Sequence, residues 1–130
     1  MANGLERARY WVEFILTRCP FPAPRTLRAQ FEASNFVEFC DCGCNSFKLR
    51  TRAGAKPPPI AAPGGYGSVF EADFRTADED KTIEIVLFAD QAGNLAYVEI
   101  DCCANSQAVP DTVELMDAPY HVNASPSLIV

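Results

Sequence analysis

The spacing of apolar residues changes near residue 36, and this change constrains the fold more than any other feature of the sequence. Before it, apolar residues recur every three or four positions, which predicts helices over residues 4–17 and 24–33. After it, apolar and polar residues alternate, which is typical of strands. We therefore expect an α+β fold in which two N-terminal helices pack on one face of a mostly antiparallel sheet of about five strands.

A single apolar stripe runs along the first predicted helix. The stripe consists of Leu5, Ala8, Val12, Ile15 and Leu16. Trp11 widens it at its edge, and Asn3 is placed to act as the N-cap. Pro24 suits the first position of the second helix, in which Leu27 and Phe31 are expected to face inward.

Sheet-forming sequence covers about residues 36–103 and begins with a hairpin that contains three cysteines. If residues 42–44 form a three-residue loop, the alternation on both faces of this hairpin is satisfied at once. The resulting register pairs Phe39 with Phe47, Val37 with Leu49, and Glu38 with Lys48.

Residues 68–76 are predicted to form a third strand, and residues 82–89 and 95–103 a second hairpin with a four-residue loop. On its apolar face the predicted pairs are Leu87 with Val98, Ile85 with Ile100, and Ile83 with Cys102. On its other face they are Glu84 with Asp101, Val86 with Glu99, and Phe88 with Tyr97.

The 130 residues are expected to form one domain. Residues 53–67 are rich in proline and glycine and show no periodicity, so we expect a flexible loop there. Residues 104–130 have the composition of turns and are predicted to form an irregular tail, with a short edge strand near residues 112–115.

The formal net charge of −6 argues against nucleic-acid binding, because phosphate contacts need an excess of lysine and arginine. The charge is also uneven. Residues 1–60 hold nine Lys or Arg and five Asp or Glu, whereas residues 61–130 hold two and twelve. An acidic half can attract a basic partner, although a merely solvated surface has the same composition.

No apolar run approaches the roughly 20 residues that span a membrane. Near the start of the chain, Glu6, Arg7 and Arg9 interrupt what would be the apolar part of a signal peptide. We therefore expect no membrane partner and a cytoplasmic protein, in which cysteines are reduced thiols or metal ligands.

Cys40, Cys42 and Cys44 are the most concentrated group of metal-ligating residues. A tetrahedral zinc site needs about four ligands, and Cys103, predicted to point outward from its strand, is the candidate for the fourth. On a straight strand, however, alternate side chains lie about 6.6 Å apart, too far to share an ion unless Gly43 makes a turn. The alternatives are thiols that fill the end of the core, and redox or disulfide chemistry.

Five carboxylates are predicted to lie on the sheet face away from the helices. They are Glu71, Asp73, Glu84, Glu99 and Asp101. Like charges directly opposite each other destabilise a sheet, and a local rule broken without compensation indicates a functional site. Such a cluster could hold a divalent cation, shift a carboxyl pKa or receive a basic partner. The alternative is that Lys81 or Arg75 and solvent neutralise it.

The run Cys40-Asp-Cys-Gly-Cys-Asn-Ser46, together with Leu87-Phe88 and Gly93-Asn-Leu-Ala-Tyr-Val-Glu-Ile100, resembles a group of small bacterial proteins of no known activity. These proteins look like a helical segment, a C-x-C-G-x-x-S element and a hairpin that ends in an x-L-E-hydrophobic strand. Val98 stands where that pattern has leucine, and Asp101-Cys-Cys103 departs from it. The resemblance implies a bacterial cytosolic protein and supplies no mechanism.

The leading functional hypothesis is a non-enzymatic binding module that engages a protein partner through the acidic sheet face, as an immunity-type inhibitor of a basic toxin would, or that forms a homodimer through it. One alternative is a metal-binding protein with a cysteine-ligated zinc or iron ion. Others are a small hydrolase that uses the clustered carboxylates, and a nucleophile–base pair of Cys44 with the only histidine, His121. No catalytic residue is predicted, because no nucleotide-binding or hydrolase motif is present.

Overall fold

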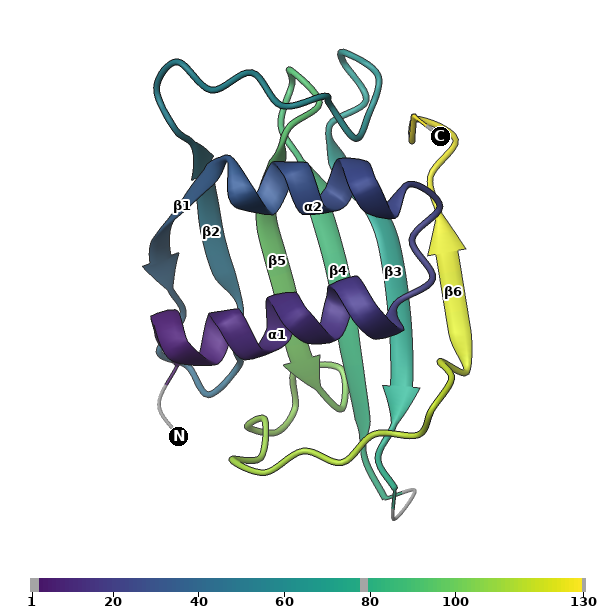
Figure 1. Cartoon of the computed structure of the whole chain (residues 1–130). Helices are drawn as coiled ribbons and strands as arrows, with labels where there is room; N and C mark the ends of the chain where they lie inside the picture. The colour runs from purple at the N-terminus through teal and green to yellow at the C-terminus, as the bar shows by residue number, and fades with distance from the viewer. Residues whose placement is uncertain (1–2, 78–79, 130) are drawn as a thin grey trace.

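The computed structural model describes residues 3–77 and 80–129, which form two helices and a six-stranded antiparallel sheet (Figure 1). The helices are α1 (Leu5–Arg18) and α2 (Pro24–Glu32). The strands are β1 (Ser34–Phe39), β2 (Phe47–Thr51), β3 (Gly67–Arg75), β4 (Thr82–Ala89), β5 (Leu95–Cys102) and β6 (His121–Ala124), in the sheet order β1-β2-β5-β4-β3-β6. The predicted α+β fold is confirmed, with six strands rather than about five.

Both helices lie across the same face of the sheet (Figure 1). The ring of Phe14 on α1 meets Phe74 on β3 edge-to-face at 5.1 Å, and Leu27 and Phe31 of α2 are buried as predicted. Trp11 is fully buried rather than at the edge of the stripe, and Leu5 is 46% exposed. The apolar stripe of α1 is therefore rotated from the predicted one, because aromatic side chains face the sheet.

The start of α1 differs from the prediction as well. Gly4, not Asn3, is the N-cap residue, and no side chain caps the helix. Asn3 instead donates its amide hydrogens to the carbonyl oxygens of Cys40 and Ser46, at 3.0 and 2.8 Å. Pro24 occupies the first turn of α2, where its missing N–H costs nothing.

The register of the β1–β2 hairpin was only partly predicted. Phe39 opposes Phe47 and Glu38 opposes Lys48, but a bulge at Val37 places Phe36 opposite Leu49. Alternation alone does not reveal a bulge, which adds one unpaired residue to a strand. The three-residue loop is also wrong, because the Cys40 N–H to Ser46 carbonyl bond leaves five residues between them.

All six predicted pairs of the β4–β5 hairpin are present, and the third predicted strand is β3. The predicted four-residue loop is wrong, because the register shifts after Phe88 and the Asp90 N–H to Asn94 carbonyl bond leaves three residues between them. The predicted edge strand near residues 112–115 is wrong: Leu115 makes an isolated bridge to Thr76, and β6 begins at His121. The segment before β6 runs along the end of the sheet below α1 in Figure 1. Arg7 of α1 holds it by donating to the carbonyl oxygens of Pro110 and Asp111.

The loop over residues 53–67 is anchored at its centre. Ile60 and Ala61 are fully buried, and both donate their N–H groups to the carbonyl of Gly93 in the β4–β5 turn. Gly93 has a φ of +86°, and a side chain there would collide with the carbonyl oxygen of Ala61. Gln30 of α2 holds the end of the same turn, because its side chain donates to Asn94 Oδ1 and accepts from the N–H of Leu95. The described helices include none that is long and apolar enough to cross a membrane.

Candidate functional site: the open face of the sheet

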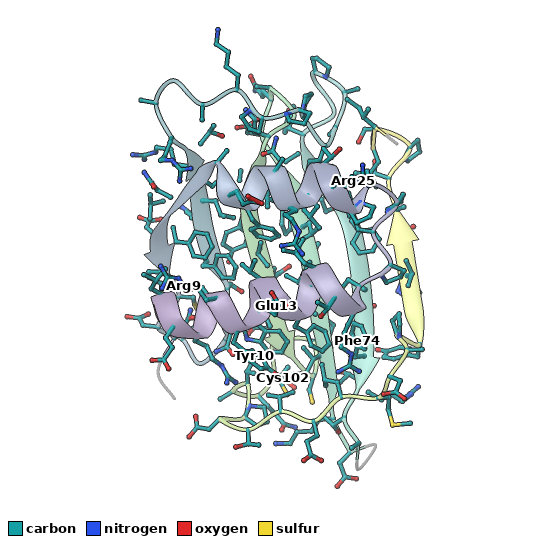
Figure 2. The ribbon with its side chains drawn as sticks, in the orientation of Figure 1. Arg9, Tyr10, Glu13, Arg25, Phe74 and Cys102 are labelled. Carbon is teal, nitrogen blue, oxygen red and sulfur yellow. A yellow bond between two sulfur atoms is a disulfide. The ribbon has the colours of Figure 1, made fainter. Side chains whose placement is uncertain are left out.

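Side chains on the sheet face opposite the helices form what we call the open face. Phe74 and Cys102 lie on the helix side of the sheet (Figure 2), so their strand neighbours Asp73 and Asp101 point the other way. The open face comprises Glu71, Asp73, Glu84, Val86, Phe88, Tyr97, Glu99, Asp101 and His121. All five predicted carboxylates therefore lie on one surface.

Strand register arranges these side chains in rows across the sheet. One row runs over β5, β4, β3 and β6 through Asp101, Glu84, Asp73 and His121. The next contains Glu99, Val86, Glu71 and Asn123, and the third runs over β2, β5, β4 and β3 through Lys48, Tyr97, Phe88 and Ser68. Side chains directly opposite on antiparallel strands have Cβ atoms about 5 Å apart, so three carboxylates stand side by side in the first row.

Within residues 3–77 and 80–129, no lysine or arginine forms an ion pair with these five carboxylates. Arg75, which the alternative interpretation assigned to neutralise them, instead stacks on the ring of Tyr120 at 4.4 Å, and among the described residues Lys81 forms no ion pair with them. Lys48 pairs with Glu38 at 3.0 Å at the far side of the sheet. Among the described residues, His121 is therefore the only potentially basic side chain within ion-pair distance of the five carboxylates.

Asp73 is the most enclosed of the five carboxylates, with a side chain only 7% exposed. Its Oδ2 lies 2.8 Å from Nδ1 of His121, while its Oδ1 is buried and has no hydrogen-bond partner. Burial is the main cause that raises the pKa of Asp73 to about 7, followed by the adjacent Glu71 carboxyl. Asp73 therefore exchanges its proton near neutral pH.

Glu99 and Asp101 form a second close pair on β5. Burial first, and then the hydrogen bond and charge of Asp101, raise the pKa of Glu99 to about 7. The open face thus contains two carboxylate pairs, each able to retain a proton near neutrality. A raised carboxyl pKa of this kind is expected where the fold holds two acidic groups closer together than their charges favour.

Glu84 lies between the two pairs. Its Oε1 accepts a hydrogen bond from the N–H of Ala104, and its Oε2 is buried without a partner. Ala104 belongs to a turn in which Cys103, Ala104 and Asn105 have φ values of 55°, 56° and 62°. Three successive left-handed residues other than glycine cost roughly 1–2 kcal/mol each. The turn that follows β5 therefore stores strain next to the cluster.

His121 is the member of this site that the sequence analysis missed. The composition of residues 104–130 predicts an irregular tail there, and the sequence suggests His121 only as a partner of Cys44. It lies on β6 at one edge of the sheet, whereas Cys44 lies in the β1–β2 loop at the opposite edge, so the pair does not form. The sequence offered one weak indication of a strand at His121, which is the β-branched residue Val122 beside it.

The cysteines of the β1–β2 loop are also brought together. Gly43, at φ +101°, makes the predicted turn, and the sulfur atoms of Cys40, Cys42 and Cys44 all lie within 4.8 Å of one another. Cys40 and Cys42 are joined in a disulfide, and Cys44 Sγ lies 3.1 Å from Cys42 Sγ. Of the alternatives for this cluster, Cys40 and Cys42 thus follow the disulfide one.

Cys103, predicted as a fourth metal ligand, does not join this group. Its sulfur lies 3.5 Å from that of its neighbour Cys102, which is fully buried. The predicted four-cysteine set is therefore not assembled. The alternative of thiols that fill the core fits Cys44 and Cys102, which are 5% and 0% exposed.

Comparison with protein-family models, curated proteins and solved structures finds no match. What the open face can do must therefore be inferred from its chemistry. A hydrolase would need a concave pocket around the carboxylates. The four cavities that we describe, of about 310 to 590 Å³, are lined by other residues, such as Thr76, Pro110 and Glu114 in the largest.

Proposed function

We propose that this protein is a non-enzymatic binding module whose open face receives a basic protein partner. One observation supports this most strongly: five carboxylates share a surface without a lysine or arginine partner in the described structure, and buried oxygens of Asp73 and Glu84 lack hydrogen bonds. Leaving such atoms unpaired costs about 1–3 kcal/mol each. Guanidinium and ammonium groups supply the missing donors and the opposite charge.

The third row of the face adds apolar contact area to the charge. Phe88 and Tyr97 are half-buried, with ring centroids 5.6 Å apart, and Val86 lies beside them. Aromatic side chains bordered by charged groups are typical of the centre of a protein interface. Like charges argue against a second copy on this face, because a twofold dimer would oppose one carboxylate cluster to another.

The proposal also covers the kind of partner, the location of the protein and the exclusion of nucleic acid. A small acidic protein that covers a basic surface could act as an immunity-type inhibitor of a basic toxin. We propose a cytoplasmic location in a bacterium, in keeping with the motif resemblance described above. We propose no nucleic-acid partner, because phosphates would be repelled by the same carboxylates.

The test uses a defined basic probe. A synthetic peptide that alternates arginine and leucine is titrated into ¹⁵N-labelled protein, and a matched glutamate–leucine peptide serves as the control. We expect amide shifts at Val86, Phe88 and Tyr97 with the basic peptide only, and an apparent Kd that rises steeply with salt. Size-exclusion chromatography with light scattering measures oligomeric state in parallel.

Charge-reversal variants locate the binding surface. Glu99→Lys should weaken peptide binding at least about tenfold, whereas Glu13→Lys, which makes the same charge change on the outer side of α1 (Figure 2), should leave it nearly unchanged. Equal weakening by the two variants would mean that only net charge matters. A stable dimer that buries Phe88 would replace the basic partner with a second copy.

The cysteine cluster supports a second candidate function, the binding of a zinc or iron ion. Three sulfurs within 4.8 Å of one another suit one ion once the Cys40–Cys42 disulfide is reduced, with a further ligand still to be supplied. Metal analysis of protein purified under reducing conditions tests it. Less than about a tenth of an equivalent of zinc or iron per chain would rule it out, because a structural site is normally filled.

A further inference from the structure

Three potential ligand atoms converge at the β3–β6 edge of the open face. They belong to Glu71, Asp73 and His121, and all lie within 4.8 Å of one another. His121 Nδ1 lies 2.8 Å from Asp73 Oδ2 and 3.8 Å from Glu71 Oε2. Two atoms that bind one ion at about 2.1 Å each are about 3 to 4.2 Å apart, depending on the angle at the ion. The observed separations therefore need little adjustment to close around an ion.

The backbone holds these three residues in place. Asp73 and His121 are directly paired across β3 and β6, and the N–H of Tyr120 donates to the carbonyl oxygen of Asp73 at 2.9 Å. The ring of Tyr120 is in turn covered by the guanidinium of Arg75. Ligands carried by paired strands are more firmly positioned than ligands on loops, which favours a preformed site.

We propose that Glu71, Asp73 and His121 form a binding site for a divalent transition-metal ion. This inference goes beyond the binding of a basic partner and does not rest on it, since it concerns the free protein.

A hydrogen bond from a protonated His121 would not by itself explain the buried carboxylate oxygens that have no partner. An imidazolium at this place donates from Nδ1 to Asp73 Oδ2 and leaves Asp73 Oδ1 buried without a partner. Glu84, directly across from Asp73, also has a buried oxygen without a partner. An ion satisfies carboxylate oxygens without needing a donor hydrogen for each, and it offsets the charge of three neighbouring carboxylates.

The donor set indicates the class of ion. One imidazole nitrogen with two carboxylates suits zinc, iron(II), cobalt(II) and similar ions, whereas magnesium and calcium prefer oxygen ligands alone. Three protein ligands leave positions for water or for a group from a partner. Glu84 is placed to accept a hydrogen bond from water on such an ion, because its free Oε2 belongs to the residue opposite Asp73.

Cobalt(II) is the probe of choice, because it is paramagnetic and its absorption spectrum distinguishes thiolate from nitrogen and oxygen ligands. Protein with the Cys40–Cys42 disulfide intact is titrated with cobalt(II) chloride, so that the cysteine loop does not offer three thiolates, and binding is measured by calorimetry and by broadening of ¹⁵N–¹H resonances. We expect one site, with broadening centred on β3 and β6 and no thiolate charge-transfer band. The cysteine cluster lies at the opposite edge of the sheet, so the two locations are readily separated.

Two substitutions test the ligands. His121→Ala and Asp73→Asn should each raise the Kd for cobalt(II) at least about tenfold. Asp117→Asn, an exposed aspartate whose only described ion pair is a 3.9 Å contact with Arg18, should change it by less than about twofold. Thermal unfolding of each variant confirms that the fold is retained, and His121 is itself exposed, so its truncation removes no core contact.

Three results would overturn the inference. The first is no cobalt(II) binding below about 1 mM, which corresponds to a free energy of only about −4 kcal/mol. The second is equal weakening by His121→Ala, Asp73→Asn and Asp117→Asn, which would mean diffuse attraction to an acidic protein. The third is broadening centred on the cysteine loop. None of these outcomes bears on the arginine–leucine peptide, whose binding is measured without metal.

Discussion

The two faces of the sheet treat polar groups in opposite ways. On the helix-covered face, the fully buried Gln30 uses both ends of its amide: it donates to the Pro58 carbonyl and to Asn94 Oδ1, and accepts from the N–H of Leu95. On the open face, Asp73 and Glu84 each leave a buried oxygen without a partner. Among the described side chains, one further buried oxygen without a partner is Asn3 Oδ1, just ahead of α1. Folded proteins satisfy nearly all buried polar atoms, so the open face, which has two of these three exceptions, is where a ligand is expected.

Arg7, a charged residue under the helices, differs from the carboxylates of the open face in the same way. It is 4% exposed, yet its guanidinium donates to Asn45 Oδ1 and to the carbonyls of Pro110 and Asp111. Trp11 donates to the same Asn45 oxygen, so α1, the cysteine loop and the tail meet in one satisfied network. Polar groups under the helices therefore stabilise the fold, whereas carboxylates on the open face oppose it and are available for binding.

The largest expected effect comes from breaking a satisfied group on the covered face. Gln30→Leu keeps about the same volume but leaves the Leu95 N–H and Asn94 Oδ1 without their partner. We expect the free energy of unfolding to fall by about 2–4 kcal/mol, measured by urea denaturation. Gln107→Leu, an exposed glutamine, is the control and should stay within about 0.5 kcal/mol. Equal effects would remove the contrast between the faces.

The second effect has the opposite sign and comes from the open face. The pKa of Asp73 and that of Glu99 are both raised to about 7, from ordinary values of 3.8 and 4.5. Between about pH 4 and 7 the folded protein holds protons that the unfolded chain releases, so its free energy of unfolding falls as pH rises through this window. After allowance for solvent screening, each group contributes on the order of 1 kcal/mol.

The double variant Asp73→Asn with Glu99→Gln measures this effect. It cannot titrate at these positions, so we expect it to be more stable than the natural chain at pH 8 by about 1–2 kcal/mol and nearly equal to it at pH 4. Urea denaturation at a series of pH values gives both curves. Parallel curves would show that the two carboxyls are not strained, and the open face would then resemble an ordinary solvated surface.

How far the sequence predicts this molecule depends on the range of the contacts involved. The β4–β5 hairpin was predicted pair by pair as far as Phe88 and Tyr97, because unbroken alternation allows one register there, but the register shift after Phe88 makes the predicted four-residue loop wrong. Alternation also placed the five carboxylates on one face. The bulge at Val37 was not predicted, because the alternation of apolar and polar residues does not show which residue is left unpaired.

The position of His121 depends on contacts that no local pattern encodes. Arg7 and Arg18 hold carbonyls of the tail against α1, more than 90 residues away along the chain, and the N–H groups of Met116 and Tyr120 join the tail to the carbonyls of Arg75 and Asp73 on β3. Neither arginine stands out in the sequence, since both lie in an ordinary amphipathic helix. The carboxylate half of the candidate site was therefore predictable, and the histidine that makes it a candidate metal site was not.

The smallest expected effect belongs to a charged pair that lies outside both the satisfied network and the strained cluster. Lys48 and Glu38 are 3.0 Å apart, on side chains that are 59% and 65% exposed. Exposed pairs of this kind contribute about 0.2–1 kcal/mol and weaken with salt. A double-mutant cycle with Glu38→Ala and Lys48→Ala should give a coupling energy at the low end of that range, vanishing in 1 M NaCl. A coupling energy well above 1 kcal/mol would mean that this sheet can hold a carboxylate and a lysine in a strongly favourable pair. The geometry of the sheet alone would then not explain why Asp73 and Glu84 have no such partner.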